Sequence, residues 1–197
     1  MSFDVVMSRG AFSLIASISM AWAVVGCSPV ANLRPASGLM PEKKLELGAG
    51  VAALGPRPFV SEEWQASGQL WVTGNASQKI TLSAITAFDT DAIAAGGALR
   101  YNALFHDRVK GGIEAELGYA WAAVSLPIAL RVFDQSFVYT APRLGTWSDD
   151  PSFGIPLGVS LRIYEGLFVR GEAQVSWQDF KYYNRRAHLA AAAAYQF

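Results

Sequence analysis

The chain has 197 residues, with 16 Lys and Arg balanced by 16 Asp and Glu, and 52% of its residues are hydrophobic. The balanced charge offers no basic field for nucleic acid, and the length is that of one domain. Beyond residue 26 no apolar run approaches the roughly 20 residues that a membrane-spanning helix needs. Two classes stay open: a secreted, unusually apolar β-sandwich, or a transmembrane β-barrel.

Residues 1–26 have the composition of an export signal. Arg9 precedes an apolar stretch that ends at Val25, and the small residue Gly26 follows it. A basic start, an apolar segment and small residues at the end are typical of secretory signal peptides. We therefore expect this segment to be removed on export.

The tetrapeptide Val24-Val25-Gly26-Cys27 resembles the lipobox of bacterial lipoproteins. The resemblance implies that Cys27 is lipidated and becomes the first mature residue, and that Ser28 after it permits transport to the outer membrane. The alternative is ordinary signal-peptidase cleavage nearby, with Cys27 incidental. Residues 27–42 contain three prolines and are expected to form an extended periplasmic tether.

From residue 43 to residue 197 apolar and polar residues alternate, which is typical of strands with two different faces. The clearest pair is 155–163 and 167–177, which the tight turn Tyr164-Glu165-Gly166 joins into a hairpin. About ten strands are expected, with eight or twelve as alternatives, and the count depends most on 93–105 and 136–146. The expected strands are 44–54, 64–74, 79–88, 93–105, 109–121, 124–132, 136–146, 155–163, 167–177 and 188–197.

The connections between these strands form a short set and a longer, more polar set. The short turns are 75–77, 106–107, 134–135 and 164–166, and the longer loops are 55–63, 89–92, 147–153 and 178–187, with a brief 122–123 as the exception. Short turns on one rim and longer loops on the other are typical of bacterial outer-membrane barrels. An even strand number would bring both termini to the periplasmic side, where the short turns lie.

The polar face of the strands carries charges of both signs. Its expected members are Glu46, Arg100, Lys110, Glu114, Glu116, Arg131, Arg162, Arg170 and Glu172. Inside a closed barrel these groups could line a polar pore or a ligand site, or they could pair and fill the lumen. We favour the paired filling, because barrels of this size are just wide enough to be filled by side chains and buried charges left unpaired are costly.

Large aromatic residues on the apolar face gather at strand ends, as in the aromatic girdles of membrane barrels. They are Trp64, Phe88, Tyr119, Trp121 and Trp177 toward the loops, and Phe105, Tyr195 and Phe197 toward the turns. The last ten residues resemble the C-terminal strand signal of outer-membrane barrel proteins, with Tyr195 and Phe197 on one face. The resemblance implies contact with the barrel-assembly machinery. Residues 190–194 alone would predict a helix, but barrel closure requires a last strand.

No catalytic, cofactor or metal site is expected. A single Cys and two distant His cannot form a zinc site, and His106 lies in a turn beside Asp107. Some small outer-membrane barrels modify lipid A with His, Ser and an acid, but His188 lacks a Ser at a spacing that resembles their motifs. Loop 178–187 mixes aromatic and basic residues, which could contact lipopolysaccharide or a partner; the alternative is a rim loop whose basic groups lie beside lipid phosphates.

Together these patterns predict an exported membrane protein. The chain is expected to be all-β: a signal peptide, a linker, and a closed antiparallel up-and-down transmembrane barrel over residues 43–197 in the bacterial outer membrane. Its expected partners are outer-membrane lipid, lipopolysaccharide and an envelope protein that binds loop 55–63 or 178–187. The expected role is structural or interactive and not enzymatic, with a narrow channel for small solutes or a lipid-modifying enzyme as alternatives.

Overall fold

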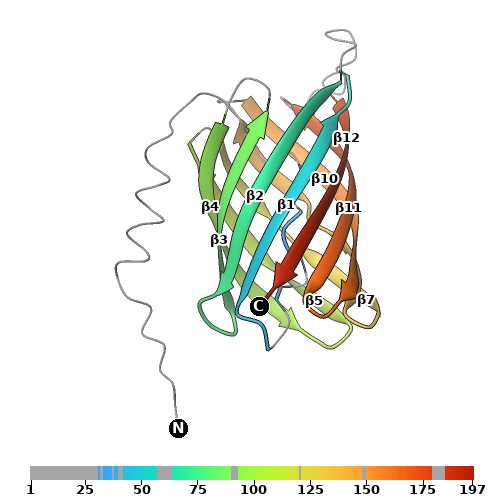
Figure 1. The fold of residues 1–197 in the computed structure, drawn as a ribbon. Helices are drawn as coiled ribbons and strands as arrows, with labels where there is room; N and C mark the ends of the chain where they lie inside the picture. Colours follow the sequence, from blue (N-terminus) through green and yellow to red (C-terminus); the bar gives the residue numbers. More distant parts are fainter. Residues whose placement is uncertain are drawn as a thin grey trace.

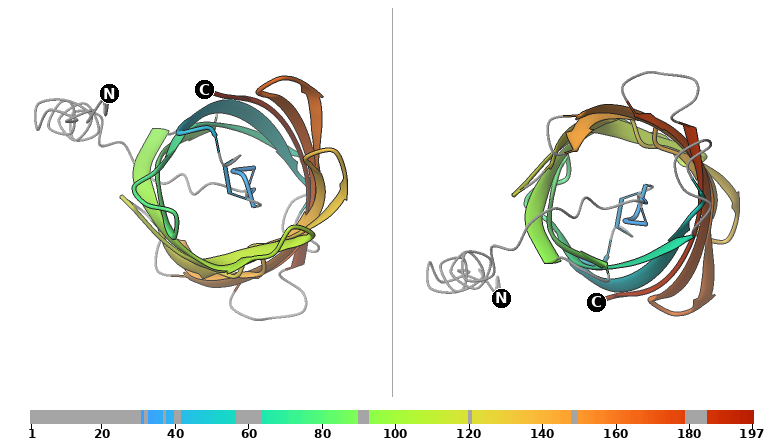
Figure 2. Two further views of the ribbon diagram at one scale, coloured as in Figure 1. Left: turned by 90° about the horizontal axis from the view of Figure 1, so that it is seen from below. Right: turned by 90° about the horizontal axis from the view of Figure 1, so that it is seen from above.

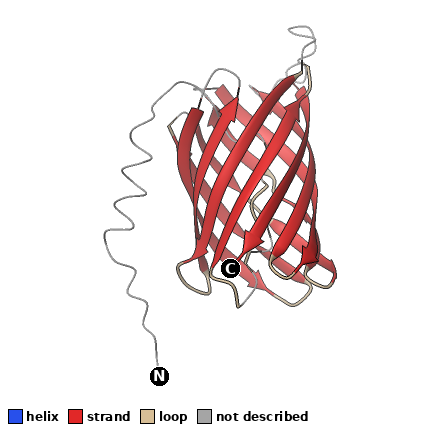
Figure 3. Ribbon diagram, viewed as in Figure 1, coloured by secondary structure: helices blue, strands red, loops and turns tan. Residues whose placement is uncertain are grey.

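The computed structural model describes residues 31, 33–36, 38–39, 42–56, 64–89, 93–119, 121–147, 150–178 and 185–197. These residues form a closed antiparallel β-barrel, which confirms the predicted fold class (Figures 1 and 3). The expected signal peptide, Cys27 and most of loops 55–63 and 178–187 lie outside the described residues. Within the described part no helix is long and apolar enough to cross a membrane.

Twelve strand segments follow one another along the chain. They are β1 (Leu45–Leu54), β2 (Gln65–Asn75), β3 (Ile80–Asp89), β4 (Ile93–Phe105), β5 (Val109–Gly118), β6 (Trp121–Ser125), β7 (Ile128–Phe133), β8 (Ser136–Thr140), β9 (Arg143–Trp147), β10 (Asp150–Tyr164), β11 (Leu167–Gln178) and β12 (Arg185–Gln196). Each pairs antiparallel with its neighbours around the ring.

The twelve segments make ten barrel strands, because β6 and β7 are two halves of one strand and β8 and β9 are halves of the next. Both β6 and β7 pair with β5 in the same register, and both β8 and β9 pair with β10 in the same register. Pro127 and Pro142 mark the two interruptions, since proline has no N–H to donate to the ladder. The breaks lie side by side, where the N–H of Leu126 donates to the carbonyl of Pro142 at 3.0 Å.

The last strand closes the barrel. β12 pairs with β1 from Gln196 to His188 on one side and with β11 on the other. Residues 190–194, which taken alone favour a helix, are therefore a strand. Closure decides this, because in lipid the edges of β1 and β11 would otherwise keep unpaired N–H and C=O groups.

One rim of the barrel carries only tight turns, and we call it the turn rim; the opposite end is the loop rim. Gln135 and Gly166 adopt the left-handed conformation in two of these turns, with φ of 61° and 78°. The register shifts in β4, β7 and β10 all occur close to the turn rim. Lys44 and Phe197 meet there, with the N–H of Lys44 donating to the carbonyl of Phe197 at 3.0 Å.

The two faces of the strands follow the predicted alternation. Large apolar side chains project outward along the whole height of the wall, as Leu117 and Leu157 do, with 72% and 64% of their surface exposed. The prediction for Trp121 was wrong, because this residue is 3% exposed and packs with Ala87 and Ala94 instead of lying in the outer aromatic band. β5 ends at Gly118, so the alternation restarts at Trp121 with the opposite parity.

Candidate functional site

The alternation of each strand aims most of the predicted polar-face charges into the barrel interior. Six of the nine are buried there: Glu46, Arg100, Glu114, Glu116, Arg170 and Glu172. The other three are half-buried and lie near the turn rim. Lys110 lies 5.6 Å from the ring centroid of Phe137, Arg162 lies 3.7 Å from Asp134, and Arg131 pairs with Phe137 across the β7–β8 ladder.

The interior also holds part of the chain that precedes the barrel. The described residues between Ala31 and Leu39, which we call the lumenal segment, lie inside the ring of strands (Figure 2). Leu33 is fully buried and Arg34 is 3% exposed. The expectation of an extended periplasmic tether over residues 27–42 is therefore corrected for the described residues between Ala31 and Leu39. The lumen accepts this segment because its walls offer acceptors for Arg34 and an apolar surface for Leu33.

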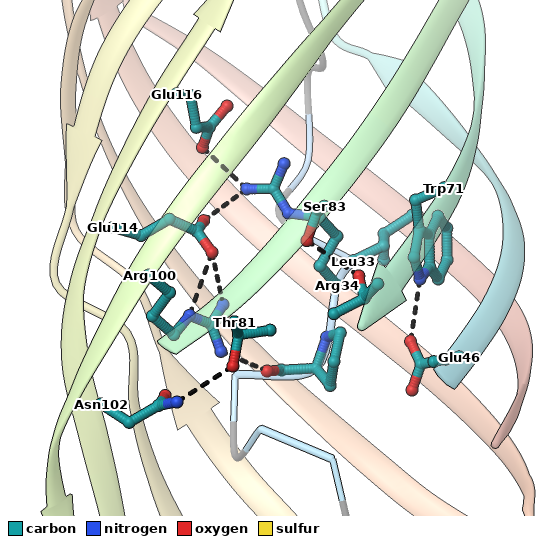
Figure 4. Close-up of polar contacts among 12 residues, drawn as sticks. Leu33, Arg34, Glu46, Trp71, Thr81, Ser83, Arg100, Asn102, Glu114 and Glu116 are labelled. Atoms are coloured by element: carbon teal, nitrogen blue, oxygen red, sulfur yellow. Dashed lines mark hydrogen bonds and ion pairs between the residues drawn. The ribbon is translucent and has the colours of Figure 1, made fainter. Parts of the chain in front are cut away.

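Arg34 lies between two glutamates of β5. Its Nη2 atom lies 2.5 Å from Oε1 of Glu114 and 2.8 Å from Oε1 of Glu116 (Figure 4). Each glutamate also binds a wall arginine: Arg100 lies 2.8 Å from Glu114, and Arg143 lies 2.9 Å from Glu116. The result is a five-residue network in which neither carboxylate depends on one partner, and such pairing is what burial of charge requires.

A second network lies around Glu46 on β1. Arg170 binds it with two hydrogen bonds, Nη1 to Oε1 at 2.8 Å and Nη2 to Oε2 at 2.6 Å. Trp71 Nε1 and Gln196 Nε2 each donate to the same carboxylate at 2.8 Å. Glu46 therefore joins β1, β2, β11 and β12 at the seam where the barrel closes. Bidentate arginine–carboxylate pairs are among the stronger hydrogen-bonded contacts in proteins.

Two wall arginines also hold the backbone of the lumenal segment. Arg170 Nη1 donates to the carbonyl of Leu33 at 3.0 Å, and Arg100 Nη1 donates to the carbonyl of Pro35. The side chain of Leu33 packs in an apolar cluster with Trp71 and Ala192. The guanidinium of Arg34, the two carbonyls and the buried side chain of Leu33 thus all hold the segment in the lumen.

The lumenal segment rises from the turn rim toward the loop rim as it is followed backward from β1. Ala36 packs with Ala129 and Phe137, next to the β7–β8 turn. Ala31 packs with Ala52 and Leu54, at the loop end of β1. The segment therefore crosses most of the height of the barrel along its axis.

Sequence reasoning missed several residues that complete these networks. They are Arg34, Trp71, Tyr139, Arg143 and Gln196. Tyr139, for example, donates from its hydroxyl to Glu172 Oε2 at 3.1 Å. One signal was present in the sequence for Arg34: it is the only charged residue between Cys27 and Glu42, and it is flanked by Leu33 and Pro35 instead of polar residues.

The two histidines have different surroundings. His106 lies in the turn after β4, where the N–H of Arg108 donates to its Nδ1 at 3.4 Å. His188 is buried on β12, and its Nε2 lies 2.5 Å from Oγ of Ser176 on β11. The sequence spacing hid this pair, because β11 and β12 bring the two residues together across a loop. A catalytic triad also needs a group that orients the base, and none of the described residues bonds Nδ1 of His188.

Among the described residues no group of three His, Cys, Asp or Glu side chains could hold a metal ion. The interior is instead dominated by arginine–glutamate pairs. Its chemistry is therefore that of a filled polar lumen, with hydrogen-bond donors directed at carboxylates and at the backbone of the lumenal segment.

A closed antiparallel barrel with an apolar exterior and a paired polar interior has the architecture of outer-membrane β-barrel proteins. An outer membrane channel from Pseudomonas putida F1 is similar at a TM-score of 0.51 and 10% identity, covering 87% of this chain and 100% of the other. The translocator domain of autotransporter NalP from Neisseria meningitidis is similar at a TM-score of 0.50 and 10% identity, covering 95% and 94%. The likeness concerns the fold. No family model and no curated protein matches the sequence.

Proposed function

We propose that this protein is a bacterial outer-membrane barrel with a structural or interaction role, whose lumen is closed by its own chain. One observation carries the closed lumen: Arg34 is buried between Glu114 and Glu116, so that the lumenal segment and the wall share one network of charges. A solute would have to displace these paired groups to pass.

The exterior supports a membrane location. Large apolar side chains that would be costly to expose to water cover the outward face of every strand, Leu45, Ile113, Leu157 and Val169 among them. Hydrocarbon around this face and a polar interior would satisfy both surfaces of the same strand. The role is non-enzymatic in this proposal, and lipidation of Cys27 and engagement of the assembly machinery by Tyr195 and Phe197 belong to it as well.

The loops are the surfaces through which such a barrel would bind a partner or lipopolysaccharide. We assign this role to loops 55–63 and 178–187, the second of which carries aromatic and basic residues in its sequence. Arg185 at the start of β12 is exposed and brings one of these charges to the loop rim. Anionic lipid headgroups and cationic side chains would attract each other there.

Membrane fractionation with gel migration before and after heating tests the location and the closed barrel together. We expect the protein in the outer-membrane fraction, with a shift in migration on heating. In planar bilayers the unmodified protein should show no steady conductance. Recovery in the soluble fraction, or stable open channels, would contradict the proposal.

The interaction role needs a separate test. Shortening loop 55–63 or loop 178–187 should reduce binding to lipopolysaccharide vesicles or weaken the envelope to detergent, while heat-modifiable migration stays intact. Shortening the turn at 76–79, on the opposite rim, is the matched control. An unchanged envelope and unchanged binding in both loop variants would remove the interaction role.

A further inference from the structure

The lumenal segment closes the barrel without being part of its wall. We propose that it is a displaceable plug, and that its departure converts the closed barrel into a passage for ions and small hydrophilic solutes. This inference rests on the proposed function, because it assumes an outer-membrane barrel that is closed in its resting state.

Each wall carboxylate that binds the plug also has an arginine partner in the wall. If Arg34 leaves, Glu114 keeps Arg100 at 2.8 Å and Glu116 keeps Arg143 at 2.9 Å. A buried carboxylate left without a cation would be strongly destabilising, and here no carboxylate is left in that state. Arg34 exchanges two carboxylates for water, and Arg100 exchanges the carbonyl of Pro35 for water.

The same holds for the second network. Glu46 is bound by Arg170, Trp71 and Gln196, and all three belong to the wall. The lumenal segment contributes only a carbonyl to this cluster, that of Leu33. Removing it returns one arginine N–H to water and leaves the carboxylate fully bound.

The plug is not built into the sheet. Its described residues belong to no strand of the barrel. Ala31, Ala36 and Gly38 are small, and the large apolar side chains Leu33 and Leu39 are buried in the lumen. Such a segment can leave as a unit, because its departure breaks no strand ladder of the wall.

The emptied lumen would be polar and would carry charges of both signs. Its wall presents, among the described residues, Glu46, Glu114, Glu116, Glu172, Arg100, Arg143, Arg170 and Arg186, with Lys110, Arg131 and Arg162 half-buried toward the turn rim. Water and small hydrophilic solutes would be accommodated by such a wall. An extended peptide with an arginine at the position of Arg34 would be recognised by the same two carboxylates as the plug.

Conductance of the full chain in planar bilayers tests the plug. Unmodified protein should stay closed, whereas Arg34→Ala, which removes both ion pairs of the plug, should open at least ten times more often. A variant that lacks residues 31–39 should conduct continuously. Arg162→Ala is the matched control, because Arg162 is also a lumen-face arginine but lies beside Asp134 at the turn rim. All variants are first checked for heat-modifiable migration.

A peptide with the sequence of residues 31–39, ANLRPASGL, provides the second arm. Added to the variant that lacks these residues, it should reduce the conductance, and the same peptide with Ala in place of Arg should not. Folded plug variants that stay closed would overturn the proposal, as would open variants that the arginine peptide fails to block. Conductance of the unmodified protein would instead contradict the closed lumen of the proposed function.

Discussion

Trp71 lies directly against the backbone of Gly48. A Cβ atom at position 48 would lie 2.1 Å from Cζ2 of the indole, far inside van der Waals contact. The absent side chain on β1 therefore makes room for the ring on β2, which places Trp71 Nε1 2.8 Å from Glu46. The missing side chain of Gly48 and the buried carboxylate of Glu46 are therefore linked through Trp71, which contacts both.

The first prediction concerns this contact. Gly48→Ala should push the indole away and lower the free energy of unfolding by about 1–3 kcal/mol, the usual cost of overpacking. Gly74→Ala is the control, because the nearest atom to its Cβ would be the carbonyl oxygen of Lys44 at 3.5 Å. Urea unfolding in lipid vesicles, followed by tryptophan fluorescence, measures both. Equal stability of the two variants would show that the indole of Trp71 can adopt another position without loss of stability.

Arg170 and Glu46 provide the second prediction. Arg170→Met removes the cation and leaves a carboxylate with less than 1% of its side chain exposed, at a cost of about 3–5 kcal/mol. The double variant with Glu46→Gln should recover part of this loss, since no charge then remains. A double-mutant cycle on urea unfolding gives the coupling, and strictly additive effects would rule out a direct contribution of the pair.

The third prediction tests which face of the wall meets lipid. Leu157 is 64% exposed in the middle of β10, so Leu157→Arg should destabilise the inserted barrel by about 2–4 kcal/mol. Leu157→Ala controls for the lost side chain and should cost less. In a water-soluble protein an exposed arginine would be tolerated, and equal stability of the two variants would argue for that class.

The fourth prediction concerns the direction of the lumenal segment. Ala31 packs with Ala52 and Leu54, at the loop end of β1. An epitope placed directly before Ala31 should therefore be reached from the same side as the loops, and not from the turn rim as a periplasmic tether would be. Antibody labelling of intact and of permeabilised cells measures this, with an epitope in the turn at 76–79 as the control. Labelling of both epitopes only after permeabilisation would contradict the direction.

The strands were predictable from the sequence because alternation with period two depends only on which face each residue occupies. The hairpin of β10 and β11, and the burial of Glu114 and Arg170, follow from that parity. The prediction fails where a loop changes whether odd- or even-numbered residues face outward, as it did for Trp121 after β5. No local pattern encodes how many residues such a loop contributes before the next strand begins.

The sequence by itself determined about ten amphipathic strands with charges gathered on one face, since side-chain alternation is a property of the local chain. Only the tertiary structure decided the rest. Residues 190–194 became a strand because β1 and β11 needed a partner. Arg34 entered the lumen because Glu114 and Glu116 meet there, and contacts across a closed barrel join residues that no sequence spacing brings together.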